Sequence, residues 1–200
     1  MAVLKIVEDG HPALKTTCRK VVRVTEDIQK LAEDMAETMR ESAGVGLAAN
    51  QVGEDIRMIA VYDEDVGHKV YVNPKIVKRS RELEYSDEGC LSFPRLVGVV
   101  GRALDVIVMA QNLDMKKVRV DASGLLARVF QHEIDHLNGI AFVERVEEGT
   151  LRRILTEEEL AEKERENAAK EAAAAGGAAD AGTAEVKDRA ETAEKERTVN

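Results

Sequence analysis

The sequence has few of the residues that mark specialised protein classes. Its 200 residues include no Trp, three Phe, three Tyr, three Pro and only two Cys. No apolar run approaches the roughly 18 residues that a membrane-spanning helix needs. The first residues have no long apolar stretch of the secretory type and turn acidic at Glu8 and Asp9. We therefore expect a cytoplasmic protein without a membrane partner, in which a disulfide between Cys18 and Cys90 is not expected.

Positive charge is also in short supply. The chain has 29 Lys and Arg against 38 Asp and Glu, a formal net charge of -9. This balance argues against general binding to a phosphate backbone, so no specific nucleic-acid partner is expected. Hydrophobic residues make up 44% of the chain and charged residues 34%. The length and this composition predict one globular domain with a hydrophobic core and a highly charged surface.

The C-terminal segment lacks the residues that build a core. Residues 161–200 contain no Leu, Ile, Met, Phe or Tyr, and their larger aliphatic residues are Val186 and Val199. Such a segment buries too little apolar surface to offset the entropy lost on ordering. We predict a folded domain over residues 1–155 and a charged tail rich in Ala, Glu and Lys over 156–200. The tail is expected to be helical from about Thr156 and disordered farther on.

Periodicity in the first part predicts a mixture of helices and strands. Thr25 is a predicted N-cap, and apolar residues at helical spacing follow it to Met39, so that this helix ends before Gly44. Strand patterns cover 57–62, 70–72, 104–110 and 117–121, with Asn73-Pro74 closing the second and a turn at 112–114. A further helix begins near Ser123 or Gly124 and stops at Gly139. The expected fold class is α+β, with antiparallel or mixed sheets packed around a central helix, an N-terminal helix and a C-terminal helix or tail.

The expected central helix carries the segment His132-Glu133-Ile134-Asp135-His136. Residues four apart lie on one face of a helix, so both imidazoles can reach one ion. Glu133 is one step round the helix and stays free to accept a proton from a metal-bound water. The chain has only four histidines, so two of them in this spacing predict a site for one divalent metal ion.

A catalytic metal needs a third protein ligand and an open position. A third histidine three residues after Gly139 is excluded, because that position is Phe142. A downstream glutamate would instead indicate a metallopeptidase, and the candidates are Glu144, Glu147 and Glu148. A third source is Cys90, which follows Gly89 in a segment stiffened by Pro94 and offers a thiolate. These residues alone leave the glutamate and the cysteine open.

Three segments together resemble the peptide deformylases. They are Gly44-Val45-Gly46-Leu47-Ala48-Ala49-Asn50-Gln51, then Glu88-Gly89-Cys90-Leu91-Ser92, then Gln131-His132-Glu133-Ile134-Asp135-His136-Leu137-Asn138-Gly139. The resemblance covers about residues 1–155 and excludes the tail. It implies a metal-dependent hydrolase that removes the formyl group from N-terminal formylmethionine of new polypeptides and releases formate. Its expected substrates are N-formylmethionyl nascent peptides, and the ribosome near its exit tunnel is a further expected partner.

The same resemblance implies roles for individual residues. Cys90, His132 and His136 would hold the metal, usually Fe²⁺ in the cell, with Zn²⁺, Ni²⁺ or Co²⁺ able to replace it. Glu133 would act as general base and then as general acid. The Gln51 amide and the Leu91 backbone N–H would stabilise the oxyanion.

Further expectations concern the substrate and the residues around the metal. The residues expected to contact substrate are Gly44, Val45, Gly46, Glu88, Gly89, Leu125 and Val129. Arg102 is expected to form an ion pair with Glu88 that fixes the loop of Cys90. The chain departs from the family at 95–101, which follow no recognised motif, and at Arg128, where many members have an apolar residue. A non-catalytic metal-binding module is the remaining alternative.

Overall fold

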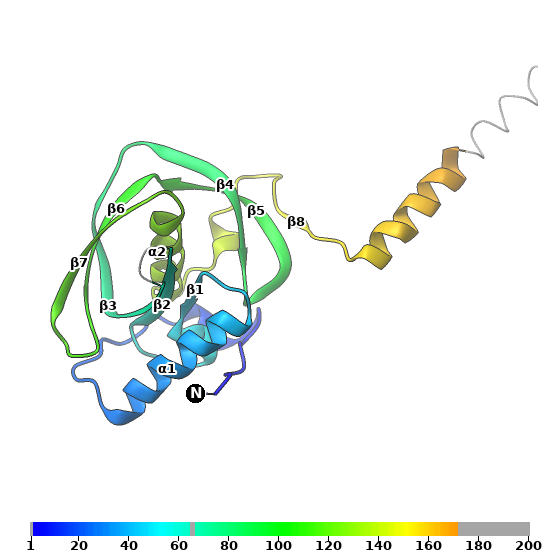
Figure 1. The fold of residues 1–200 in the computed structure, drawn as a ribbon. Helices are drawn as coiled ribbons and strands as arrows, with labels where there is room; N and C mark the ends of the chain where they lie inside the picture. Colours follow the sequence, from blue (N-terminus) through cyan, green and yellow to red (C-terminus); the bar gives the residue numbers. More distant parts are fainter. Residues whose placement is uncertain (1, 65–66, 172–200) are drawn as a thin grey trace, which may run out of the picture. The chain divides into compact units, whose positions relative to one another are not determined.

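The computed structural model describes residues 2–64 and 67–171 (Figure 1). The chain divides after Ile154 into two compact units. Within the described part of the first unit, the elements follow one another in this order: η1 (Pro12–Lys15), α1 (Glu26–Glu41), β1 (Gly46–Ala48), η2 (Ala49–Val52), β2 (Met58–Asp63), β3 (Gly67–Arg79), β4 (Leu83–Cys90), β5 (Phe93–Ala103), β6 (Asp105–Gln111), β7 (Lys117–Ser123), α2 (Gly124–Leu137), η3 (Phe142–Glu144) and β8 (Arg152–Arg153).

The predicted N-terminal helix is confirmed as α1. The Thr25 hydroxyl accepts a hydrogen bond from the Ile28 backbone N–H at 3.4 Å, which makes Thr25 the N-cap. Helical spacing puts Ala32, Met35 and Met39 on one face, and all three are buried. This face packs against β1, β2 and β3. The helix therefore covers one side of the sheet that leads into the functional site.

The strands form two antiparallel sheets. The larger has the order β1-β2-β3-β6-β7 and the smaller the order β4-β5-β8. β1 and β4 are therefore outer strands of their sheets. Figure 1 shows α2 among strands of both sheets, and α2 packs against β1, β2, β3, β5, β6 and β7. The predicted α+β class with antiparallel sheets is confirmed.

One predicted strand end is wrong. The pattern over 70–72 was expected to stop at Asn73-Pro74, but β3 continues from Gly67 to Arg79. Its pairing with β6 shifts between Val72 and Lys75, so Pro74, which has no N–H to donate, falls in the irregularity. Asn73 adopts a φ of 52° there, and its side-chain amide donates to Gln111 Oε1 at 2.8 Å. The bulge thus allows the strand to continue through Asn73-Pro74, a pair of residues that usually ends a strand.

β4 and β5 were not predicted as strands. Residues 83–87 of β4 are all exposed, so the strand lacks the alternation of apolar and polar residues that marks a half-buried strand. The segment 95–101, which matched no motif, lies within β5. The pairing of these two strands is a long-range property of the hairpin that neither local pattern reveals. The other predicted strands correspond to β2, β6 and β7, and the turn at 112–114 separates the last two.

α2 is buried on every face along most of its length. Residues 127–137 are all buried, including His132, Glu133 and His136. Gly139 ends the helical turn with a φ of 74°, and its N–H donates to the His136 carbonyl at 2.9 Å. The helix therefore brings polar side chains into the interior, where each must find a partner.

The second unit is described only to residue 171. Residues 157–171 are helical, and Thr156 and Glu159 form reciprocal side-chain to backbone hydrogen bonds of 2.8 and 3.2 Å. The predicted helix from about Thr156 is confirmed in this part, and the predicted disorder lies outside the described residues. None of the described helices is long and apolar enough to cross a membrane.

Candidate metal centre and active site

The structure brings together the three predicted metal ligands. Cys90 is the last residue of β4, and both histidines come from α2. Cys90 Sγ lies 3.2 Å from His136 Nε2, and one ligand atom from each of the three residues lies within 4.8 Å of the others. The thiol from one sheet thus meets two imidazoles from successive turns of the helix, the arrangement that the family resemblance implies.

These residues fit a single divalent ion. Bonds of about 2.0 Å to nitrogen and about 2.3 Å to sulfur, at tetrahedral angles, separate two ligand atoms by roughly 3.5 Å. The 3.2 Å between Cys90 Sγ and His136 Nε2 is close to this distance, and one ligand atom of His132 lies within 4.8 Å of both. His136 is fully buried, and burial holds the pKa of its imidazole well below the usual value, so it stays neutral as a ligand must be.

His132 is oriented by a carboxylate behind it. Its Nδ1 lies 3.1 Å from Glu88 Oε2, which leaves Nε2 as the ring nitrogen for the site. Burial lowers the pKa of His132, but hydrogen bonding to Cys90 and Glu88 outweighs burial and raises the pKa to about 10. Metal binding displaces the proton that this imidazole otherwise holds.

Glu133 lies in the interior without a hydrogen bond to one of its oxygens. Its side chain is 3% exposed, and Oε2 has no partner. Burial raises the pKa of this carboxyl to about 7. A side chain on Gly46 of β1 would overlap the Glu133 carboxylate, so only glycine allows β1 to approach this closely. The result is a carboxyl group poised to accept or release a proton near neutral pH.

Gln51 is held with its amide nitrogen toward Cys90. Its Oε1 accepts a hydrogen bond from the Ala48 N–H at 2.8 Å, which fixes the orientation of the amide. Its Nε2 lies 3.4 Å from Cys90 Sγ and 3.3 Å from Ser92 Oγ. The sequence reasoning missed Ser92, although this residue lies within one of the three recognised segments.

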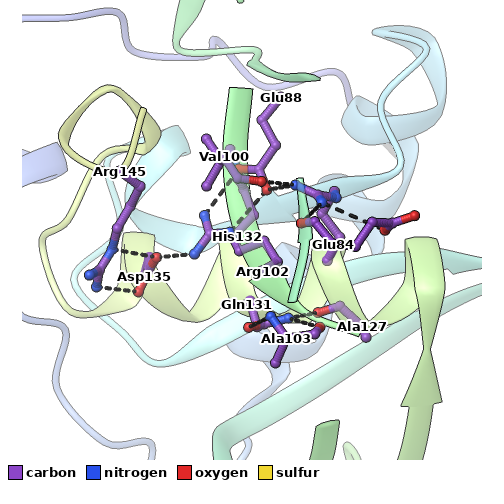
Figure 2. A network of polar contacts seen from close by, with 11 residues as sticks. Glu84, Glu88, Val100, Arg102, Ala103, Ala127, Gln131, His132, Asp135 and Arg145 are labelled. Atoms are coloured by element: carbon purple, nitrogen blue, oxygen red, sulfur yellow. Dashed lines mark hydrogen bonds and ion pairs between the residues drawn. The ribbon is translucent and has the colours of Figure 1, made fainter. Parts of the chain in front are cut away.

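A network of buried charges lies behind the ligands (Figure 2). The predicted ion pair is present: Arg102 Nε donates to Glu88 Oε1 at 2.9 Å and Arg102 Nη2 to Glu88 Oε2 at 3.0 Å. Arg102 Nη1 also donates to Asp135 Oδ2 at 2.5 Å, and Arg145 bonds to the same carboxylate at 3.2 and 3.3 Å. Burial raises the pKa of Glu88, but the bonds from His132 and Arg102 outweigh it and lower the pKa to about 2. Glu88 is therefore a permanent anion behind His132.

Other partners of the site were not predicted. Arg128, noted only as a departure, is buried and donates to Glu88 Oε1 at 2.8 Å. Asn50 donates to the His136 carbonyl at 2.6 Å. Gln131 holds β5 by bonds to the Ala103 backbone N–H and carbonyl. One sequence signal could have indicated Arg128: it precedes His132 by four residues on α2, so the two side chains lie on the same face of the helix.

A cavity of about 380 Å³ opens onto the candidate site. Glu133, Cys90 and His132 line it together with Gln51 and Leu91. His136 and Arg102 are not among its lining residues. All seven residues predicted to contact substrate line the cavity: Gly44, Val45, Gly46, Glu88, Gly89, Leu125 and Val129.

Comparison with known proteins identifies the family. The family model for polypeptide deformylase matches residues 3–151. The chain belongs to the polypeptide deformylase family. The peptide deformylase of Carboxydothermus hydrogenoformans is 48% identical over 149 residues, which span 74% of this chain and 95% of that protein. That of Dictyoglomus thermophilum is 46% identical over 151 residues, or 75% of this chain and 97% of that protein.

A solved structure agrees with the sequence comparisons. The Met-Ala-Ser-bound crystal structure of a class I type b peptide deformylase from Acinetobacter baumannii is 38% identical. It superposes with a TM-score of 0.69 and covers 72% of this chain and 99% of that one. The predicted activity is thereby confirmed: this deformylase is a hydrolase that removes the formyl group from N-formylmethionyl peptides with the help of a metal ion. The family match ends before residue 152, so the tail lies outside it.

Proposed function

We propose that Cys90, His132 and His136 hold the metal ion of this deformylase. The proposal rests on one observation, the meeting of the Cys90 sulfur with two helical imidazoles at the cavity. Three protein ligands leave one coordination position for water or substrate. A thiolate with two imidazoles suits Fe²⁺, which we propose as the ion in the cell, and also accepts Zn²⁺ or Ni²⁺.

A metal ion held by these three residues would act as a Lewis acid and would lower the pKa of the water that attacks the formyl carbon. Glu133 accepts the proton of this water, for which its raised pKa of about 7 suits it. It then delivers the proton to the nitrogen of the departing methionine. The C–N bond of the formamide breaks, and the products are formate and a peptide with a free amino terminus. One carboxylate thus performs both proton transfers.

Gln51 and Leu91 are the proposed donors to the oxygen that becomes negative during attack. The Gln51 amide is already oriented by its bond to Ala48, so little reorganisation is needed when charge develops. The backbone N–H of Leu91, which follows Cys90 directly, is the second proposed donor. Removing one donor of this kind costs about 10²–10³ in rate.

The substrate peptide is proposed to lie in the cavity between β1 and β4. Both are outer strands of their sheets, so each has a backbone edge that an extended peptide can join. Gly44, Val45, Gly46 and Gly89 would follow the peptide backbone, while Leu125 and Val129 would contact the methionine side chain. The Acinetobacter relative was crystallised with Met-Ala-Ser bound, which supports a peptide as the ligand.

Several broader assignments follow from this proposal. Residues 1–155 are the proposed catalytic domain and 156–200 an appended tail. N-formylmethionyl chains arise in the bacterial-type cytoplasm, where we place the enzyme, and the ribosome near its exit tunnel is the proposed larger partner. Glu88 and Arg102 are proposed to position His132 and the end of β4.

A formate-release assay tests the proposed function. Protein purified without oxygen and analysed for bound metal should release one formate per formyl-Met-Ala-Ser consumed. The Cys90→Ala variant should lose both metal and activity. A Cys90→Ala protein that kept both would favour a metallopeptidase with a glutamate ligand, although the Glu144 carboxylate already accepts the Ala141 N–H at 2.9 Å. Loaded wild-type protein without formate release would indicate a non-catalytic metal-binding module.

A further inference from the structure

Arg128 is a buried cation that the proposed mechanism does not use. It lies on α2 one turn before His132 and is 6% exposed. An arginine is almost never buried this deeply unless its charge is paired. Because desolvating a guanidinium is costly, its partners indicate what the residue holds in place.

Both terminal nitrogens of Arg128 bond to the β4–β5 hairpin. Nη1 donates to Glu88 Oε1 at 2.8 Å and to the Val100 carbonyl at 2.9 Å. Nη2 donates to the Glu84 carbonyl at 2.7 Å. Figure 2 labels the three acceptor residues, Glu84, Glu88 and Val100, within the network. One side chain of α2 therefore contacts both strands of the β4–β5 hairpin, and Cys90 is the last residue of the first of these strands.

The contact with Glu88 completes the hydrogen bonding of that carboxylate. A carboxylate offers about four lone-pair sites. Glu88 receives two bonds from Arg102, one from Arg128 and one from His132 Nδ1. Because every site is filled, the carboxylate has little freedom to rotate, and the imidazole that it holds is fixed as well.

Arg102 and Arg128 connect different elements. Arg102 comes from β5 and bonds to Glu88 and Asp135. Arg128 comes from α2 and joins that helix directly to the Glu84 and Val100 backbone. The two arginines thus close a loop of contacts between α2, β4 and β5. Arg128 thus adds direct bonds from α2 to the backbone of β4 and β5, beside the contacts that Glu88 and Cys90 make with the two histidines.

We propose that Arg128 is a positioning residue for the metal centre, which holds the helix of His132 and His136 at a set distance from the strand of Cys90. The inference rests on the proposed metal ligands. Its consequence is tighter metal binding through a preformed ligand set, since residues behind the ligands contribute roughly 10–100-fold to metal affinity.

The test compares Arg128→Met with Arg119→Met. Methionine keeps an unbranched stem and removes the guanidinium, and Arg119 is an exposed arginine whose bonds go to Asp121. The affinity for Co²⁺ and for Ni²⁺ is measured by chelator competition, together with urea unfolding of the metal-free and loaded forms. Arg128→Met should weaken metal binding by about tenfold, should shift the visible Co²⁺ spectrum, and should destabilise the loaded form more than the metal-free form. Arg119→Met should leave all these properties unchanged.

Unchanged metal affinity in Arg128→Met, or equal destabilisation of both forms, would show a purely structural role and overturn the proposal. If Arg128→Met does not fold, Arg128→Lys supplies the test. A lysine cannot reach all three acceptors at once, so the metal affinity of Arg128→Lys should fall below that of the wild type; affinity equal to the wild type overturns the proposal. Formate release by the wild type is scored separately. Its failure would reject the proposed function while the metal affinities still decide the role of Arg128.

Discussion

The environment of Glu133 separates it from the other acidic residues around the metal site. Glu88 receives four hydrogen bonds and has a pKa of about 2, whereas Glu133 has an unpartnered oxygen and a pKa of about 7. The two carboxylates lie on neighbouring elements with opposite properties. Bonding makes Glu88 a fixed anion, and burial makes Glu133 a group that exchanges its proton readily.

Replacing Glu133 by Gln should separate metal binding from chemistry. The amide is nearly isosteric and cannot accept the proton of the attacking water. We expect the metal content to be unchanged and kcat for formyl-Met-Ala-Ser to fall by about 10²–10⁴, the usual contribution of a positioned acid–base group. Metal analysis and formate release on the same sample measure both effects. Turnover near the wild-type level would reject Glu133 as the base.

Removal of the metal should expose one thiol. Cys18 is 4% exposed, and burial, with a smaller contribution from Asp55, raises the pKa of its thiol to about 11. It should therefore not react with a thiol reagent near pH 8. Cys90 lines the cavity and should react once a chelator has removed its metal.

Thiol titration with a chromogenic disulfide reagent measures this difference. The loaded protein should react slowly, the chelated protein should yield one thiol per chain, and denaturant should yield the second. Cys18→Ala serves as the control and should leave the native reaction intact. Rapid reaction of Cys90 in fully loaded protein would argue against the sulfur as a ligand.

The sequence predicted which residues meet at the cavity better than it predicted the residues that support them. His132, Glu133 and His136 follow from helical spacing alone, and Cys90, Gln51 and Leu91 from the family resemblance. Arg128 acquires its contacts from β4 and β5, and Ser92 from Gln51 in η2, and these partners are distant in sequence. Asp135, which lies between the two histidines of the motif, bonds to Arg102 and Arg145 and so belongs to the same buried network.

At the scale of elements, the predictions succeeded where periodicity or capping was strong. α1 has a threonine N-cap and an apolar stripe, and α2 has a glycine just after its end. β4 is exposed over most of its length and gains its pairing only from β5. β3 passes through Asn73-Pro74 by means of a bulge. Both errors arose because tertiary pairing overrode local propensity.

Replacing Gly139, just after the end of α2, should lower the free energy of unfolding more than replacing a glycine that has open space around it. Its φ is 74°, and an added Cβ would lie 2.7 Å from the Lys15 carbonyl oxygen. Gly10 has a φ of 89° with nothing within 4 Å of an added Cβ, so Gly10→Ala is a matched control for backbone strain alone. We expect Gly139→Ala to lower the free energy of unfolding by about 3 kcal/mol and Gly10→Ala by about 1 kcal/mol.

Urea unfolding of the metal-loaded proteins measures both values. The difference between the two variants reports the contact of Gly139 with the segment of η1, because the backbone strain is common to both. Equal losses of stability would mean that the Lys15 segment moves away freely. The end of α2 would then not depend on close packing at that point.

At the scale of the whole molecule, the domain boundary matters for the cavity. The family match ends at residue 151, yet β8 and Ile154 continue the first unit. Arg152 bonds to Asp87 at 2.5 and 2.9 Å, and Ile154 N–H donates to the Arg95 carbonyl at 2.7 Å. Ile154 lines the cavity with 52% of its surface exposed. Composition alone predicted a boundary near 155 and could not reveal this contact with the site.

Two truncations should therefore differ in substrate binding. The 1–160 fragment keeps β8 and Ile154, and we expect it to fold and to match the kcat/KM of the full chain. The 1–151 fragment loses an apolar wall of the cavity, and contact with an isoleucine side chain contributes on the order of 1–3 kcal/mol. Its KM for formyl-Met-Ala-Ser should rise by about tenfold while kcat changes little, because the metal ligands and Glu133 remain. An unfolded 1–160 fragment would make the tail part of the domain. Equal KM values for the two fragments would mean that substrate does not reach Ile154.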